Sequence, residues 1–190
     1  MGLQHAAPRF PHWNYFLALE EDLERASRYV ELVDANGPTY SLEFAHLLFA
    51  AAAEVEVVAI SLCHLFDQKS TASAFADCIA PLRKTFPQMW QERVFVPRTG
   101  LVLQPLAEWE RRKNNKPLWW QSYNHVKHAR HSAFEQATMK HAANALVVLF
   151  LFALDLRRYA RDGKDVRVLE TRIVMSQMIA PRARLFEVLT

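Results

Sequence analysis

Apolar residues recur at alternating spacings of three and four along most of this chain, which is typical of helices that bury one face. The first stripe of this kind contains Phe16, Leu19, Leu23, Ala26, Val30 and Val33. It stops at Asn36-Gly37-Pro38, where glycine can form a helix cap and proline cannot continue the helix. The pattern predicts an amphipathic helix that ends just before this turn.

A second and longer helix is predicted from Ser41, a plausible N-cap, to about Gln68. Its stripe contains Leu42, Ala45, Phe49, Ala52, Glu56, Ala59, Cys63 and Phe66. Glu56 is the one carboxylate in this stripe, and an unpaired charge in a core would cost several kcal/mol. We therefore expect Glu56 to form a supporting ion pair with a cation from another helix, and Lys127, His128 and Arg130 are the candidates by type.

The rest of the chain predicts a shorter helix over about 70–85, an extended insertion near 93–104 and further helices after it. Two apolar runs flank Pro97-Arg98-Thr99-Gly100, which favours a small hairpin or an extended loop. Ser132-Ala133-Phe134-Glu135 fits a capping box, so a helix starts there or the preceding helix bends. The last long helix is apolar nearly all round, which predicts the central helix of the core.

These elements together predict an all-α fold, a bundle of about five helices in a single domain that spans residues 1–190. Its core covers about residues 12–162. The extension 163–190 is expected to be irregular or strand-like, because Val166, Val168, Ile173 and Met175 alternate with polar residues. With 51% apolar residues, a chain of 190 residues can bury a substantial core.

Residues 119–131 are rich in side chains that can bind a ligand or take part in catalysis. At about 100° per residue, one helix face carries Trp120, Tyr123, Asn124, Lys127 and His131, and His128 lies at its edge beside Asn124. A core helix rarely places Asn, Lys and His beside its Trp and Tyr, because each buried polar group requires a partner. We therefore expect this helix to line a cleft or an interface.

Charge adds a possible partner for this helix. Residues 111–131 contain six Lys and Arg and no Asp or Glu, whereas residues 17–35 carry a net charge of −4. A basic surface of this kind could meet an anion such as RNA, and the acidic first helix could equally dock on it within the domain. Both interpretations stay open from charge alone.

The expected cellular compartment follows from sequence features that are missing. Cys63 and Cys78 are too far apart for a short metal or redox motif, so reduced thiols are expected. No cationic segment followed by an apolar run opens the chain, and the most apolar run, 145–154, is shorter than the ~18 residues of a membrane span. A cytoplasmic protein with no membrane contact is therefore expected.

An apolar helix with Glu54-Val55-Glu56, then Trp119-Trp120 with Tyr123, Asn124, Lys127, His128 and Arg130, then a long Ala/Leu/Phe helix, resembles bacterial HEPN-like proteins over about residues 12–160. The resemblance implies RNA binding and a metal-independent endoribonuclease of a toxin–antitoxin or antiphage system. It also implies a homodimer, formed through the helix of residues 119–131 or the apolar helices, and an antitoxin or other protein partner. No cofactor and no metal are implied. Other members of that superfamily are non-catalytic RNA- or protein-binding proteins.

The chain departs from the family motif in one position that matters. The family places an Arg a few residues before its His, and no Arg lies between Lys116 and Arg130. If the resemblance holds, the catalytic residues are His128 as general acid or base, Lys127 or Arg130 stabilising the phosphorane charge, and Asn124 orienting the His or the phosphate. Trp120, Tyr123 and His131 are the expected binding residues.

Other chemistries remain as alternatives. Glu43 with His46, and His125 with His128, have the spacing of metal ligands, although a di-iron bundle needs a second Glu-x-x-His pair and two further carboxylates. Trp119, Trp120 and Tyr123 could form a nucleotide pocket, or the two Trp could be core anchors with their indole N–H groups hydrogen-bonded. The alternative to an enzyme is a non-catalytic helical interaction protein, in which the expected ion pair of Glu56 has only a structural role.

Overall fold

The structure is a computed structural model, and it describes residues 11–110, 116–162 and 187–189. Six α-helices dominate it, so the predicted all-α fold is confirmed. They are α1 (Pro11–Ala26), α2 (Leu42–Phe66), α3 (Phe75–Thr85), α4 (Pro105–Glu110), α5 (Leu118–Ala133) and α6 (Met139–Asp162). Short 3-10 helices η1 (Asp34–Asn36), η2 (Pro87–Gln91) and η3 (Phe134–Gln136) connect them.

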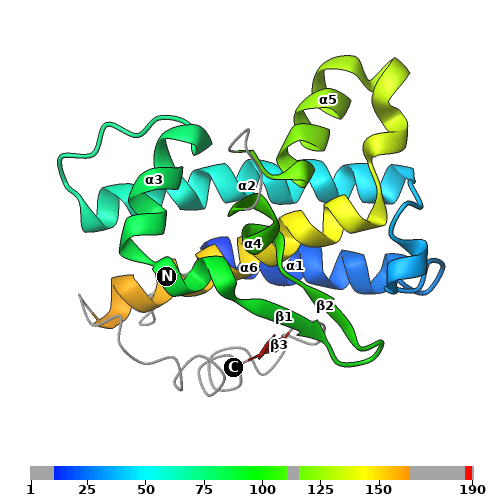
Figure 1. The fold of residues 1–190 in the computed structure, drawn as a ribbon, viewed down its shortest axis with the longest axis horizontal. Coiled ribbons are helices and arrows are strands. Elements are labelled where there is room, and N and C mark those ends of the chain that lie inside the picture. Colours follow the sequence, from blue (N-terminus) through cyan, green and yellow to red (C-terminus); the bar gives the residue numbers. More distant parts are fainter. Residues whose placement is uncertain (1–10, 111–115, 163–186, 190) are drawn as a thin grey trace, which may run out of the picture.

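The core is built around α6, which packs along α2 and is also covered by α1 (Figure 1). Every residue of α6 from Ala142 to Asp155 is buried, as the apolar pattern predicted for a central helix. At one end of this core, Phe150 lies against Trp13 and Phe16 of α1, with ring centroids 6.0 and 5.2 Å away. Burial of these large side chains supplies the main driving force for the fold.

Local signals placed α2 and the hairpin correctly. Ser41 caps α2, since its Oγ accepts a hydrogen bond from the Phe44 backbone N at 3.1 Å. Strands β1 (Arg93–Val96) and β2 (Leu101–Leu103) form the predicted antiparallel hairpin. Gly100 takes the positive φ of 75° that its turn requires and donates its N–H to Val96 O at 2.9 Å. A third strand, β3 (Glu187–Leu189), pairs with β1, giving the order β2-β1-β3.

The end of the first helix was predicted wrongly, and of the two alternatives left open at Ser132 the start of a new helix is not observed. The first helix ends at Ala26 rather than near Asn36, and the chain turns at Ser27, whose Oγ donates to Glu24 O at 2.6 Å. A serine hydroxyl that competes for backbone groups weakens a helix at that point. The last long helix begins at Met139 and not at Ser132, because Phe134–Gln136 form η3. The predicted strand-like residues 166–175 and the chain start before Pro11 lie outside the described residues.

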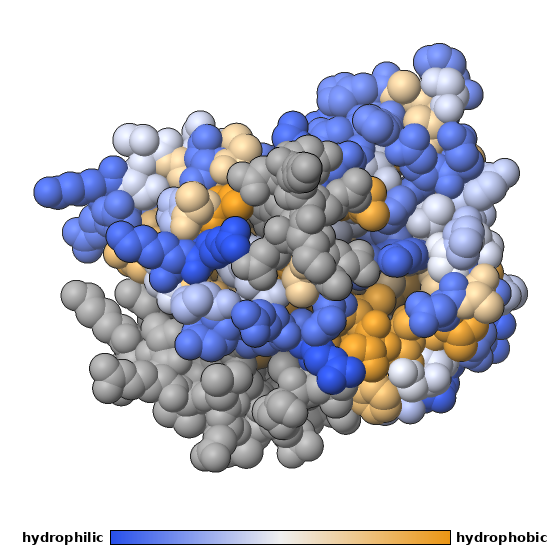
Figure 2. Space-filling view, in the orientation of Figure 1, coloured by the Kyte–Doolittle hydropathy of each residue, from blue (hydrophilic) through white to orange (hydrophobic). Residues whose placement is uncertain are grey.

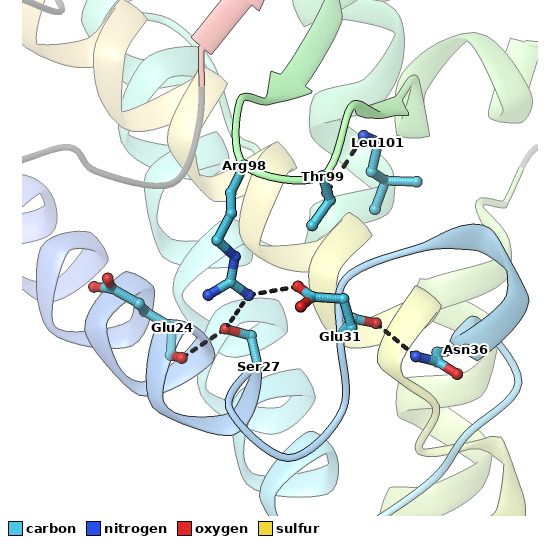
Figure 3. A network of polar contacts seen from close by, with 7 residues as sticks. All are labelled: Glu24, Ser27, Glu31, Asn36, Arg98, Thr99 and Leu101. Carbon is cyan, nitrogen blue, oxygen red and sulfur yellow. Dashed lines mark hydrogen bonds and ion pairs between the residues drawn. The ribbon is translucent and has the colours of Figure 1, made fainter.

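The hairpin tip is tied to the turn after α1 by a polar network (Figure 3). Arg98 Nη2 donates to Ser27 Oγ at 2.8 Å and to Glu31 Oε1 at 2.6 Å. Asn36 Nδ2 in turn donates to the Glu31 carbonyl at 2.9 Å. These contacts join segments far apart in the sequence, which explains how an irregular turn after α1 keeps one conformation.

By length and composition alone, α2 and α6 could cross a membrane. The apolar run 145–154 is too short to do so by itself, but each of the two helices is long enough. The 18-residue window of α6 is 83% buried inside the protein, as befits a core helix, while that of α2 is 50% buried. The cores of soluble proteins contain such helices, so these two give only weak support for a membrane location. The cytoplasmic location stays a prediction.

Candidate functional site

Helix α5 stands out from the body of the bundle on top of the N-terminal half of α2 (Figure 1). A small core separate from the main one holds it there, formed by Ala45 of α2, Val126 of α5 and Ala137. The space-filling view shows mainly hydrophilic side chains over this projecting part (Figure 2). The helix that carries the candidate residues is therefore rooted in the domain and open to solvent on its outer side.

The aromatic end of α5 is an anchor. Trp119 is 1% exposed and Tyr123 is 6% exposed, while Trp120 is half-buried. The Trp120 ring lies 4.4 Å from Phe75 of α3 and 5.2 Å from Tyr123, between centroids. These contacts tie α5 to α3, and burial leaves Trp119 no face for a nucleotide, so Trp119 is a core anchor. Its indole N–H, which was expected to be hydrogen-bonded, has no partner among the described residues.

A kink divides α5 into two parts. Ala129 has φ −140° and ψ 45°, which interrupts the helical backbone, so the capping-box alternative in which the helix bends is the one observed. Beyond a kink, the spacing of an uninterrupted helix no longer predicts which residues share a face. Arg130 and His131 are therefore positioned by the kink, and the grouping of His131 with Trp120 and Tyr123 on one regular face was wrong.

The two cations nearest the kink are exposed and held over aromatic rings. Lys127 Nζ lies 5.3 Å from the Tyr123 ring centroid, and the Arg130 guanidinium carbon lies 5.0 Å from that of Phe49. Those two rings meet edge to face at 5.8 Å between centroids. Within the described part of the chain neither cation pairs with a carboxylate, so each keeps its charge while its position is restricted.

His128 and His131 are also exposed, and among the described residues neither ring has a hydrogen-bond partner. His125 differs, since its Nδ1 lies 2.9 Å from Gln136 Oε1. Asn124 is half-buried, and its Nδ2 donates to the Trp120 carbonyl at 2.7 Å. The amide that was expected to orient His128 or a phosphate thus bonds to its own helix in this structure.

Glu56 has a partner other than the expected one. Its Oε1 accepts a hydrogen bond from the backbone N of Phe75 at 2.9 Å, at the N-terminus of α3. Lys127, His128 and Arg130 form no ion pair with it among the described residues. A carboxylate suits the positive end of a helix, so the half-buried position of Glu56 needs no cation. The predicted ion pair was wrong, and the residue joins α2 to α3.

Cys63 and Cys78 are both free and fully buried, as expected of reduced thiols. Burial raises the pKa of each thiol above its usual range, most strongly that of Cys78. A thiol with a raised pKa is a poor nucleophile and metal ligand. For metal sites more generally, no three His, Cys, Asp or Glu of the described residues cluster closely enough to hold an ion.

The sequence pattern also missed a polar contact between His12 of α1 and Glu54 of α2. His12 Nδ1 lies 2.6 Å from Glu54 Oε1, and the two side chains are 28% and 18% exposed. Both residues were visible in the sequence, but only the packing of α1 on α2 brings them together. The pair fixes the start of α1 against the middle of α2.

Comparison of the chain with models of protein families, with curated proteins and with solved structures finds no match. The resemblance to HEPN-like proteins therefore remains a prediction from the residues quoted above.

Proposed function

We propose that this protein binds RNA through the exposed side chains around the α5 kink, which we call the α5 basic site: Lys127, His128, Arg130 and His131. The proposal rests on the surroundings of the two basic side chains, Lys127 and Arg130. Each lies on an aromatic ring and is free of carboxylate partners among the described residues. A restricted, uncompensated cation loses less side-chain entropy when it meets a phosphate than a freely moving one does.

We further propose metal-independent RNA cleavage at this site, in a toxin–antitoxin or antiphage setting, with His128 as the group that exchanges the proton. An imidazole can both accept and donate a proton, which suits transfer of a proton from a ribose 2′-hydroxyl or to the leaving oxygen. Lys127 and Arg130 stand on either side of His128 in sequence and would stabilise charge on the phosphorane. Asn124 would have to release the Trp120 carbonyl before it could assist.

The second candidate function is a non-catalytic interaction protein, and a specific observation favours it over cleavage. Of the residues expected in the active site, Asn124 is bonded to backbone and Tyr123 is buried, and no described side chain orients the His128 ring. In this case the α5 basic site binds RNA or an acidic protein partner, such as an antitoxin, without chemistry. Both proposals include a cytoplasmic location for the protein.

Cleavage of total RNA in EDTA by the wild type and by His128→Ala distinguishes these two functions. His64→Ala is the matched control, because His64 is also an exposed histidine and lies on α2, away from α5. Cleavage by the wild type and the control that disappears in His128→Ala supports the nuclease. Cleavage that persists in His128→Ala refutes the catalytic role of His128, and RNA binding by all three proteins without cleavage supports the interaction protein.

A further inference from the structure

Tyr40 presents an exposed aromatic ring close to the point where α5 ends. The residue is 52% exposed, although an isolated antiparallel bridge between Tyr40 and Thr138 fixes its backbone against the start of α6. The preceding residue strengthens this connection, because the Met139 backbone N donates to the Thr39 carbonyl at 2.7 Å. The ring is therefore carried by a backbone segment that is tied to the core.

The Tyr40 ring packs edge to face on Phe134, the first residue of η3. The two ring centroids lie 5.8 Å apart and the ring planes are at 88° to each other. In an edge-to-face pair one ring offers its edge and the other a single face, so Phe134 leaves at least one face of Tyr40 uncovered. About half of the Tyr40 surface accordingly stays accessible to solvent.

The small core that holds α5 on α2 also connects Tyr40 to the α5 basic site. Phe134 and Phe49 both pack against that core. Tyr40 lies against the first of these rings, and the Arg130 guanidinium carbon lies 5.0 Å from the centroid of the second. From Leu42, where α2 begins, the helix rises about 10 Å to Phe49. One short run of nucleotides can therefore reach both Tyr40 and Arg130.

The charges near Tyr40 favour an uncharged group over its ring. Glu43, in the first turn of α2, and Glu135, in η3, are both exposed. Carboxylates repel phosphate groups, whereas a nucleic-acid base is uncharged and stacks on an aromatic face. A strand whose phosphates contact Lys127 and Arg130 would therefore turn a base, and not its backbone, toward Tyr40.

We propose that Tyr40 is a stacking site for a base of single-stranded RNA whose phosphates contact the α5 basic site. This inference rests on the RNA binding proposed above and names the class of RNA. In a duplex the neighbouring bases cover each other's faces, so an unpaired base is needed to stack on a side chain. Trp120, which was expected to bind, is half-buried and packs on Phe75 and Tyr123. Tyr40, which the sequence pattern did not single out, takes that role.

The first test compares the affinities of the wild type and Tyr40→Ala for a labelled single-stranded RNA. Tyr40→Ala should bind about 5- to 150-fold more weakly with an unchanged salt slope, because it loses a stacking contact and no phosphate contact. Tyr40→Phe keeps the ring and should bind as the wild type does. Tyr29→Ala is the matched control, because Tyr29 is 89% exposed and lies in the turn after α1. An oligomer of the same length with stable abasic spacers in place of the nucleosides should bind equally to the wild type and to Tyr40→Ala.

The possible results separate this inference from the proposed function. If the wild type binds the single strand and Tyr40→Ala binds it equally well, the stacking site is refuted while RNA binding by α5 stands. An equal loss of affinity for the abasic oligomer also refutes stacking, and a wild type that binds no RNA refutes both proposals. Photocrosslinking to an RNA that carries 5-iodouridine reads the contact directly. Mass spectrometry should find the adduct on Tyr40, and adducts confined to Trp120 would overturn the assignment.

Discussion

Replacing Glu56 by Ala tests whether this carboxylate caps α3 or pairs with the cations of α5. The substitution removes one charged acceptor from the Phe75 N–H, at the positive end of α3. Caps and hydrogen bonds to charged groups contribute about 1–2 kcal/mol each, and the half-buried position supports the middle of that range. For a chain of this size the melting temperature should fall by about 2–8 °C. Glu56→Gln keeps an acceptor oxygen and should lose less.

The assay is a double-mutant cycle in urea between Glu56→Ala and Lys127→Gln, and a second cycle with Arg130→Gln. Because neither cation contacts Glu56, the coupling free energies should lie below about 0.3–0.5 kcal/mol, the usual error of additivity. Hydrogen exchange in residues 75–78 should increase in Glu56→Ala, since the first turn of α3 loses its acceptor. Coupling of about 1 kcal/mol or more with either cation would refute the assignment and restore the ion pair expected from sequence.

Three further predictions concern stability. Hydrogen bonds from the backbone of Ser73 and Ala74 lower the pKa of Asp77 below its usual range. Its contribution to the free energy of unfolding should therefore be fully present above the usual pKa of an Asp and disappear as pH falls through the lowered pKa. The free energy of unfolding of the wild type should therefore approach that of Asp77→Asn as pH falls from 7 to 2. A difference between the two proteins that stays constant over this range contradicts the prediction. Arg98→Ala should speed hydrogen exchange in residues 93–103 while costing under about 1 kcal/mol, because the pair is exposed. Phe150→Ala should cost about 3–5 kcal/mol in urea unfolding, and a loss below 1 kcal/mol would contradict its core position.

Local chemistry was enough to predict several elements from sequence. Ser41 starts α2 because its hydroxyl accepts a hydrogen bond from a backbone N–H three residues later, and Gly100 closes the hairpin because it tolerates a positive φ. The helix around Leu149 was predicted to be central because apolar residues surround it. In each case the decisive interaction lies within a few residues or in the composition of one helix.

Other features depend on contacts between residues far apart in the chain, and these features could not be predicted from sequence. The partner of Glu56 is the start of α3, a loop away in the chain, and a search by charge type overlooks a backbone N–H. The capping box of residues 132–135 favoured either a bend or a new helix, but no proline or glycine marks Ala129 as the position of the kink. On α2, apolar residues occur nearly all round, so their spacing does not reveal which third is left uncovered. Leu42 was expected in the core for this reason and is exposed.

The proposed binding of RNA by Lys127 and Arg130 is tested most directly by the salt dependence of binding to a labelled single-stranded RNA. Lys127→Gln/Arg130→Gln is compared with Lys69→Gln/Lys84→Gln, which removes two exposed lysines outside α5 and leaves the same net charge. Loss of two phosphate contacts should lower the slope of log affinity against log salt by about 1.4 for the first variant alone. Equal slopes and affinities in the two double variants would contradict the claim.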